Sequence, residues 1–213
     1  VEGMLSEQTQ IGRYLDALDG LGNDALPGAP GPDSPLMLPP GLSPVNVSVR
    51  ELLEPLIERA AATAALQGRT WHGPEQWPEW SCRASAHDGA AILEIVANLL
   101  ENAFRYSPSG CGIGLLLLNN GLCIWDDGPG IPEDERTRIF QRGERGSAGI
   151  DRPGTGLGLA LARDLAAQQG GELALIVPPS NVSATLPQRG NAFRLSWPSP
   201  PTPPSPPTPP SAT

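Results

Sequence analysis

The hydrophobic pattern is clearest over residues 90–107, AAILEIVANLLENAFRYS. Apolar side chains recur there with the i, i+3, i+4, i+7 spacing that places them on one face of a helix. They are Ile92, Ile95, Val96, Leu99, Leu100 and Ala103. The opposite face carries Asn98 and Asn102, one turn apart, and asparagine costs about 0.6 kcal/mol relative to alanine inside a helix. A mid-helix asparagine often faces solvent or bonds a nearby carbonyl, so a binding role needs support from the rest of the chain.

A second helix is expected ahead of this one. Ser48 is a suitable N-cap, and Glu51 three residues later completes a capping box. The helix then runs to about Gln67, with Pro55 as a kink or a first-turn break. The stretch RTWHGPEQWPEWSCRAS that follows predicts short strands around a proline-rich turn, with its tryptophans as packing anchors.

After the central helix the periodicity changes to that of strands. Two apolar runs flank Asn119, Asn120 and Gly121, which predicts a hairpin whose second strand ends at Asp126. Residues 131–153 are polar and glycine-rich, with one short helical element over residues 134–140. An irregular stretch of this length inside a domain is usually functional, often a lid.

The rest of the pattern completes the domain. A second Ala/Leu-rich helix is expected over residues 155–169, and residues 171–177 and 192–197 form the strands of a final hairpin. The domain is therefore assigned to residues 45–197.

The two ends of the chain differ from this domain in composition. Residues 1–21 have an apolar seam in which Met4, Ile11 and Leu18 keep a heptad spacing, as at the end of a helical dimerisation segment. Residues 22–44 contain seven prolines and indicate a linker. Residues 198–213 form a proline-rich tail, expected to be disordered or polyproline II, either a spacer or a ligand for a proline-reading domain. A start at Val1 suggests a piece of a longer protein.

Composition excludes several function classes. The 213 residues carry a net charge of -9, which argues against a nucleic-acid surface. All fourteen basic residues are arginine, so a Walker-A loop, a protein-kinase strand lysine and a Schiff-base lysine are excluded. Three cysteines without CxxC spacing indicate neither a disulfide framework nor a zinc site. No apolar run reaches the length of a membrane span.

Two glycine-rich stretches are candidates for ligand binding. GTGLG at residues 154–158 precedes the second Ala/Leu helix, where backbone N–H groups can cradle phosphate. It departs from the dinucleotide fingerprint at Leu159, where GxGxxG needs a small residue. The stretch DDGPG at residues 126–130 places a carboxylate at a strand end, followed by a thin backbone; its alternative interpretation is an ordinary tight turn.

In combination these stretches resemble the catalytic ATP-binding domain of sensor histidine kinases, in the GHKL superfamily shared with type II topoisomerases and mismatch-repair ATPases. NLLENAFRYS matches the N box of that family, DDGPGIP the G1 box, RIFQRGERG the F box and GTGLGLALA the G2 box, in the family's order. The resemblance extends over residues 45–197. It implies an α/β two-layer sandwich, with a mixed sheet covered on one face by about three helices and an ATP lid.

The resemblance implies ATP and Mg²⁺ as cofactors. The implied nucleotide contacts are Asn98, Asn102, Arg105, Tyr106, Asp126, Gly128, Gly130, Arg145, Arg152, Gly154, Thr155, Gly156, Leu157 and Gly158. Asn102 would ligate Mg²⁺ through its amide oxygen, a hard donor, with Asn98 close to the metal and phosphates. Arg105 would reach a phosphate, Tyr106 would flank the adenosine, and Asp126 would accept from the adenine 6-amino group. The glycines would let the ring approach or present N–H groups to phosphate.

The lid would close over the triphosphate. Arg145 and Arg152 are the candidates to meet the terminal phosphate, and Arg152 joins Asn98 and Arg105 in the implied catalytic set. The alternative for each lid arginine is a solvated surface charge. Phe140 would anchor the lid by packing.

Hydrolysing relatives carry a glutamate one turn before the metal asparagine, where it can act as general base. Here that position is Asn98, so the site is built to hold ATP for an external nucleophile. Glu101, about 100 degrees round the helix from Asn102, is expected to be a surface residue. His72 and His87 do not sit in a phosphoacceptor motif, so the acceptor histidine is expected upstream of this chain.

The function expected from the resemblance is transfer of the γ-phosphoryl group of Mg-ATP to a histidine, and onward to a response regulator. The expected partners are ATP, an upstream dimerisation and phosphoacceptor hairpin of the same protein, and a receiver domain; no nucleic acid or membrane contact is expected. A cytoplasmic location follows, with a parent protein that is soluble or membrane-anchored. The alternatives are a serine kinase of the anti-sigma type and a non-catalytic ATP-sensing module.

Overall fold

A five-stranded mixed sheet organises the molecule in the computed structural model, which describes residues 48–82, 89–144, 146–147 and 156–198. The strands are β1 (Thr70–His72), β2 (Gly112–Leu118), β3 (Gly121–Asp126), β4 (Glu172–Ile176) and β5 (Asn191–Ser196), in the order β1-β2-β3-β5-β4. β1 pairs with β2 in parallel, and the other neighbours are antiparallel. The sheet thus brings β3 and β5, which lie far apart in the sequence, side by side.

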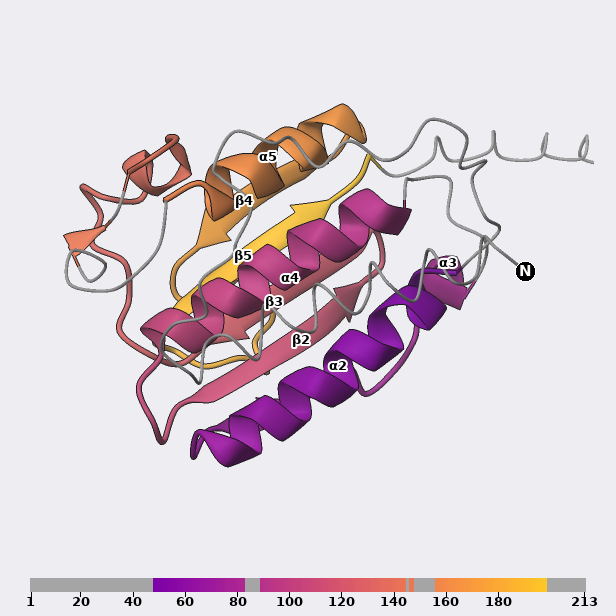
Figure 1. Cartoon of the computed structure of the whole chain (residues 1–213), viewed down its shortest axis with the longest axis horizontal. Coiled ribbons are helices and arrows are strands. Elements are labelled where there is room, and N and C mark those ends of the chain that lie inside the picture. The colour runs from indigo at the N-terminus through magenta and orange to yellow at the C-terminus, as the bar shows by residue number, and fades with distance from the viewer. Residues whose placement is uncertain (1–47, 83–88, 145, 148–155, 199–213) are drawn as a thin grey trace, which may run out of the picture.

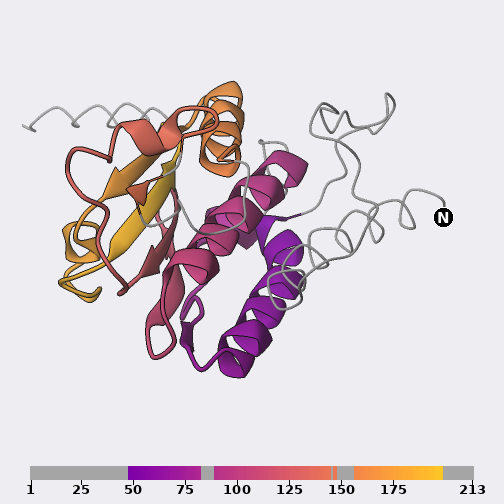
Figure 2. The same ribbon diagram turned by 60° about the vertical axis from the view of Figure 1, so that its left-hand side comes forward.

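Three helices cover one face of this sheet (Figures 1 and 2). They are α2 (Val49–Leu66), α4 (Gly89–Tyr106) and α5 (Gly158–Gln168), with the short helices α3 (Glu79–Cys82), η2 (Arg138–Phe140) and η4 (Pro179–Asn181) in the connections. This arrangement confirms the predicted two-layer α/β sandwich. No described helix is both long and apolar enough to cross a membrane.

The helix starts follow local chemistry. The Ser48 hydroxyl accepts from the Glu51 N–H at 3.2 Å, and the Glu51 carboxylate accepts from the Ser48 N–H at 2.8 Å. This capping box confirms the predicted start of α2. The helix continues through Pro55 without ending.

The core lies between the helices and the sheet. On α4, Ile92, Ile95, Val96, Leu99 and Leu100 are fully buried, as their spacing predicts. Alternate strand residues meet them from the sheet, including Ile113, Leu122, Ile124 and Leu195. A smaller cluster around Cys123 and Trp125 occupies the opposite sheet face.

Arg69 fixes the C-terminal end of α4. Its guanidinium donates to the Phe104 carbonyl at 2.9 Å and to the Ser107 carbonyl, and it lies 5.8 Å from the centroid of the Phe104 ring. A cation on the last carbonyls of a helix satisfies unpaired acceptors and complements the helix dipole. The final turn of α4 is thereby attached to the start of β1.

Local expectations differ from the structure at two places. Residues 79–82 form one turn of helix rather than a strand, because the Ser81 N–H and hydroxyl both donate to the Pro78 carbonyl, at 2.9 and 2.6 Å. The Trp80 indole N–H donates to the Leu118 carbonyl at 2.8 Å. The helix expected to begin at residue 155 begins at Gly158. The predicted segments at residues 1–21 and 22–44, and the tail from residue 199, lie outside the described residues.

Candidate functional site

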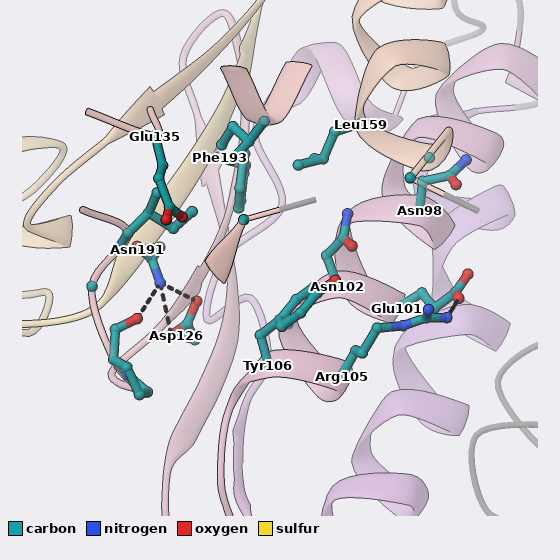
Figure 3. A pocket seen from close by; sticks show the side chains of 18 of the residues that line it. Asn98, Glu101, Asn102, Arg105, Tyr106, Asp126, Glu135, Leu159, Asn191 and Phe193 are labelled. Atoms are coloured by element: carbon teal, nitrogen blue, oxygen red, sulfur yellow. Dashed lines mark hydrogen bonds and ion pairs between the residues drawn. The ribbon is translucent and has the colours of Figure 1, made fainter. Parts of the chain in front are cut away.

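A cavity of about 430 Å³ opens between the C-terminal half of α4, the loop after β3, and the start of α5 (Figure 3). Its volume is in the range of small-molecule sites. Eight of the predicted site residues line it: Asn98, Asn102, Arg105, Tyr106, Asp126, Gly130, Gly156 and Gly158. These residues come from three separate sequence motifs, which the fold brings to one place.

Asp126 forms one end of the cavity. It is the last residue of β3 and is buried, and its carboxylate accepts from the Gly128 N–H at 2.9 Å. Burial raises the pKa of Asp126 to about 6, against the hydrogen bonds from Gly128, Asn191 and Ser107 that favour its ionised form. Asp126 is therefore a buried acceptor that is charged at neutral pH.

Asn191, the first residue of β5, lies beside Asp126 in the cavity wall and was not among the residues predicted from the sequence. It is the direct register partner of Asp126, and its Nδ2 lies 3.4 Å from each oxygen of that carboxylate. The same Nδ2 donates to the Pro129 carbonyl at 2.9 Å, while Oδ1 accepts from the Ile131 N–H at 2.8 Å. Figure 3 shows this amide between Asp126 and the loop. Its only sequence signal was a polar residue just before a predicted strand.

The two predicted glycines of the loop have different surroundings. A Cβ on Gly128 would lie 2.9 Å from Asp126 Oδ1 and 3.3 Å from Ser107 Oγ, so this glycine makes room for the carboxylate; it does not line the cavity. A Cβ on Gly130 would meet nothing closer than 3.8 Å, and Gly130 lies at the cavity wall. Asp127 closes the base of the loop by accepting from the Gly112 N–H at 2.8 Å.

The α4 wall carries the polar residues of the central helix. The Asn98 Nδ2 donates to the Glu94 carbonyl at 2.9 Å. Its Oδ1 faces Gly158, where an added Cβ would come within 2.8 Å of it. Asn102 projects one turn further along, into the cavity beside Tyr106 (Figure 3). The Asn102 amide thus lies at the cavity.

Glu101, expected to be a surface residue, lies at the edge of the cavity. Its side chain is 34% exposed, and it pairs with the Arg105 guanidinium one turn later on the same helix (Figure 3). The helix face that carries Arg105 therefore also brings a carboxylate to the cavity.

The rim opposite α4 comes from the chain on both sides of residues 148–155. Glu135 accepts from the Ser147 N–H at 3.0 Å, and Gly143 donates its N–H to the Gly156 carbonyl at 3.1 Å. Gly156 has φ +71°, and a Cβ there would lie 2.8 Å from the Glu144 carbonyl oxygen. Leu157 is 37% exposed and does not line the cavity. Arg145, Arg152, Gly154 and Thr155 lie outside the described residues.

The described lining is rich in negative charge. Four carboxylates line it, those of Glu101, Asp126, Glu135 and Glu144, together with the guanidinium of Arg105. Glu101 pairs with Arg105, and Glu144 pairs with Arg138 at 2.8 Å. Within the described ranges no group of three or more His, Cys, Asp or Glu residues could hold a metal by itself. A phosphate ligand would need further positive charge, from a cation or from residues outside these ranges.

Phe140 and His72, also considered in the sequence, do not line the cavity. Phe140 is buried and packs edge-on against Phe193, with ring centroids 6.2 Å apart, which confirms packing at the base of the glycine-rich stretch. His72 is exposed on β1 and stacks near Trp125, at 5.1 Å between centroids, outside the cavity. His87 lies outside the described residues.

Residues 87–201 match the family described as "Histidine kinase-, DNA gyrase B-, and HSP90-like ATPase". The sensor histidine kinase Hik2 of Thermosynechococcus vestitus is 38% identical over 162 residues, which are 71% of this chain and 38% of that protein. The two-component sensor PhoQ of Pseudomonas aeruginosa is 45% identical over 87 residues, 40% of this chain and 19% of PhoQ. The chain thus spans less than two-fifths of the length of these curated relatives.

Solved structures agree with these relatives. The mycobacterial sensor histidine kinase MprB aligns with a TM-score of 0.56 at 26% identity, over 73% of this chain and 100% of that one. The catalytic domain of histidine kinase ThkA shares the fold, with a TM-score of 0.57 at 18% identity over 74% of this chain and 96% of that one. Since the family match covers more than half of the sequence, this chain belongs to the histidine kinase-, DNA gyrase B- and HSP90-like ATPase family and carries its ATP-binding domain.

Proposed function

We propose that this chain is the catalytic domain of a sensor histidine kinase, which positions Mg-ATP so that a histidine elsewhere in the parent protein can take the γ-phosphoryl group. A receiver domain of a response regulator would then accept it. The observation that carries this proposal is the joint placement of Asn98, Asn102 and Tyr106 on one wall of a cavity that ends at Asp126. The kinase names of the relatives favour it over a serine kinase or an ATP sensor.

Base recognition is assigned to Asp126. Its carboxylate is ionised at neutral pH and is buried in the cavity wall, where it can accept from an exocyclic amino group. Adenine offers such a donor at its 6-position, whereas guanine offers a carbonyl there. A charged acceptor therefore favours adenine.

Metal binding is assigned to Asn102. Mg²⁺ prefers oxygen ligands and is usually held by few protein groups together with phosphate oxygens. The amide oxygen of Asn102 is such a donor, and the acidic lining around it tolerates a cation better than a bare triphosphate. Bound Mg²⁺ would neutralise charge on the phosphates, while Arg105, Arg145 and Arg152 are the arginines proposed to contact them, and Gly154, Thr155 and Gly156 the backbone donors.

Phosphoryl transfer rather than hydrolysis follows from Asn98. An amide cannot take a proton from water, so the α4 wall supplies no general base at the position where hydrolysing relatives have glutamate. Glu101, the carboxylate of α4 that lines the cavity, is paired with Arg105. The site is therefore suited to hold ATP until an outside nucleophile arrives.

Calorimetric titration with a non-hydrolysable ATP analogue, with and without Mg²⁺, tests the site. Asn102→Ala should abolish the Mg²⁺ dependence of binding, and Asp126→Asn should weaken the ATP analogue by about 10- to 100-fold, the equivalent of one charge-assisted hydrogen bond. Glu54→Gln, on the outer surface of α2, serves as a matched control. A folded parent chain that binds no nucleotide contradicts the proposal.

The transfer step is tested by adding the helical hairpin from the same full-length protein. Incubation with Mg-ATP should produce a phosphohistidine, stable to alkali and labile to acid, on the hairpin. Phosphoserine on a partner would instead support the serine-kinase class, and nucleotide binding without any transfer would support a sensing module.

A further inference from the structure

We propose that Asn191 is a positioning residue for base selection: its single amide holds residues 129–131 of the loop after β3 beside Asp126 and so sets the slot in which a base is read. The inference rests on the proposed function for the identity of the ligand. It concerns a residue from the last strand, 65 positions away from the carboxylate it faces.

The loop follows the end of β3 without regular structure, and Pro129 lacks an N–H group. Its first two residues are held without Asn191, since Asp127 exchanges hydrogen bonds with Gly112 and the Gly128 N–H donates to Asp126. Two loop backbone groups end on the Asn191 side chain: the Pro129 carbonyl at 2.9 Å and the Ile131 N–H at 2.8 Å. The amide thus spans the loop on both sides of Gly130, which lines the cavity.

The same amide also faces the recognising group. Its Nδ2 lies 3.4 Å from both oxygens of Asp126, and it helps to keep that buried carboxylate ionised. Asn191 is only 5% exposed, so these contacts are shielded from water. The Asn191 side chain therefore contacts both the Asp126 carboxylate and the loop that a planar base would meet.

These contacts require both the donor and the acceptor of a side-chain amide. The Ile131 N–H needs an acceptor, whereas the Pro129 carbonyl and the Asp126 carboxylate need donors. Alanine supplies neither, and aspartate keeps an acceptor but places a second negative charge against Asp126. Because the neighbouring β3–β5 register fixes the Cα of Asn191 opposite Asp126, the contacts depend on side-chain identity and not on a flexible backbone.

The experiment compares Asn191→Ala, Asn191→Asp and a control, Asn181→Ala, by two measurements. Asn181 also donates from Nδ2 to a backbone carbonyl, that of Val177 at 3.2 Å, but it is exposed and outside the cavity. The first measurement is the ratio of affinities for non-hydrolysable ATP and GTP analogues with the same triphosphate. The second is amide hydrogen exchange at Ile131 without nucleotide.

Both Asn191 variants should reduce the adenine preference by about tenfold or more, while the control leaves it unchanged. Asn191→Ala should also accelerate exchange at Ile131, and Asn191→Asp should retain most of its protection. Equal weakening of both analogues, or unchanged exchange at Ile131 in Asn191→Ala, would overturn the inference. If the parent chain binds no nucleotide, the proposed function fails, and the exchange measurement still decides whether Asn191 holds the loop.

Discussion

The two ends of the cavity are built differently. At the base end, hydrogen bonds link the loop at residues 127–131 to Asp126 and Asn191, which lie on the adjacent strands β3 and β5. At the other end, the polar face of α4 meets a rim on which Glu101 pairs with Arg105 and Glu144 pairs with Arg138. The base end is held by its own hydrogen bonds, whereas the other end would gain positive charge from Mg²⁺ in the proposed complex.

The two ends are therefore expected to have different roles in nucleotide binding. A preorganised base end can select the nucleotide without a conformational change, because its donors and acceptors are already fixed. An acidic phosphate end repels a bare triphosphate and gains from each added cation. Variants at the base end should therefore change selectivity, and variants at the phosphate end should change metal and salt dependence.

The largest effect is expected where the base end meets the sheet. Gly190 has φ +101°, and a Cβ there would lie 1.9 Å from the Asp126 carbonyl oxygen. Gly190→Ala should lower the free energy of unfolding by about 3 kcal/mol or more, through backbone strain and overlap together. Chemical denaturation measures this.

Gly170→Ala is the matched control for that variant. Gly170 also has positive φ, +71°, but nothing lies within 4 Å of its added Cβ. It should lose only about 1 kcal/mol, the conformational cost alone. Equal losses in the two variants would mean that contact with Asp126 contributes nothing.

A smaller effect is expected from the ionisation of Asp126. Its folded-state pKa of about 6 lies above the ordinary 3.8, so the carboxyl is protonated in the folded chain between about pH 4 and 6 while the unfolded chain is ionised. The stability this proton contributes is present below pH 4 and is lost as pH rises to 6, a loss of about 3 kcal/mol at most. Denaturation of the parent chain against Asp126→Asn across this range measures the loss.

Nucleotide binding should instead favour the ionised form of Asp126, which accepts from adenine in the proposed complex. At pH 6 the ATP analogue should release about half a proton from Asp126, and at pH 8 none. Calorimetry in two buffers of different ionisation enthalpy detects the release. Asp126→Asn corrects for titration of the nucleotide itself, and an identical release in this variant would exclude Asp126 as the source.

The sequence predicted the elements of the fold where local pattern determines them. The fully buried face of α4, the Ser48 cap and the hairpin turn at Asn119 and Asn120 each follow from residues close together in the chain. The one-turn helix at residues 79–82 was not predicted, because one turn is too short to show a hydrophobic period; it is closed by the Ser81 hydrogen bonds to Pro78 and carries the long-range bond from Trp80 to Leu118.

The site residues show the same difference between local and long-range determinants. Asn98, Asn102 and Asp126 could be recognised because short motifs surround them. Asn191 could not, since its role comes from the β3–β5 register, which joins residues 65 positions apart. Glu101 was expected at the surface, and its side chain is 34% exposed; that it also lines the cavity follows from Arg105, its partner one turn later, which lines the cavity too.

The smallest expected effect tests the phosphate end through Glu101. Its carboxylate pairs with Arg105 and adds negative charge beside Asn102, and the side chains of Glu101 and Arg105 are 34% and 19% exposed. Glu101→Gln should tighten binding of the ATP analogue by about two- to fivefold at low salt, since a partly exposed charge pair is worth about 0.5–1 kcal/mol. The gain should shrink at 1 M salt, where charges are screened beyond about 3 Å. Glu54→Gln removes a similar helical pair with Arg50, at 2.7 Å on α2, and should leave binding unchanged. Weaker binding by Glu101→Gln would mean that the carboxylate holds Arg105 in its binding position, and the acidic phosphate end would then be an arginine scaffold instead of a charge to be neutralised.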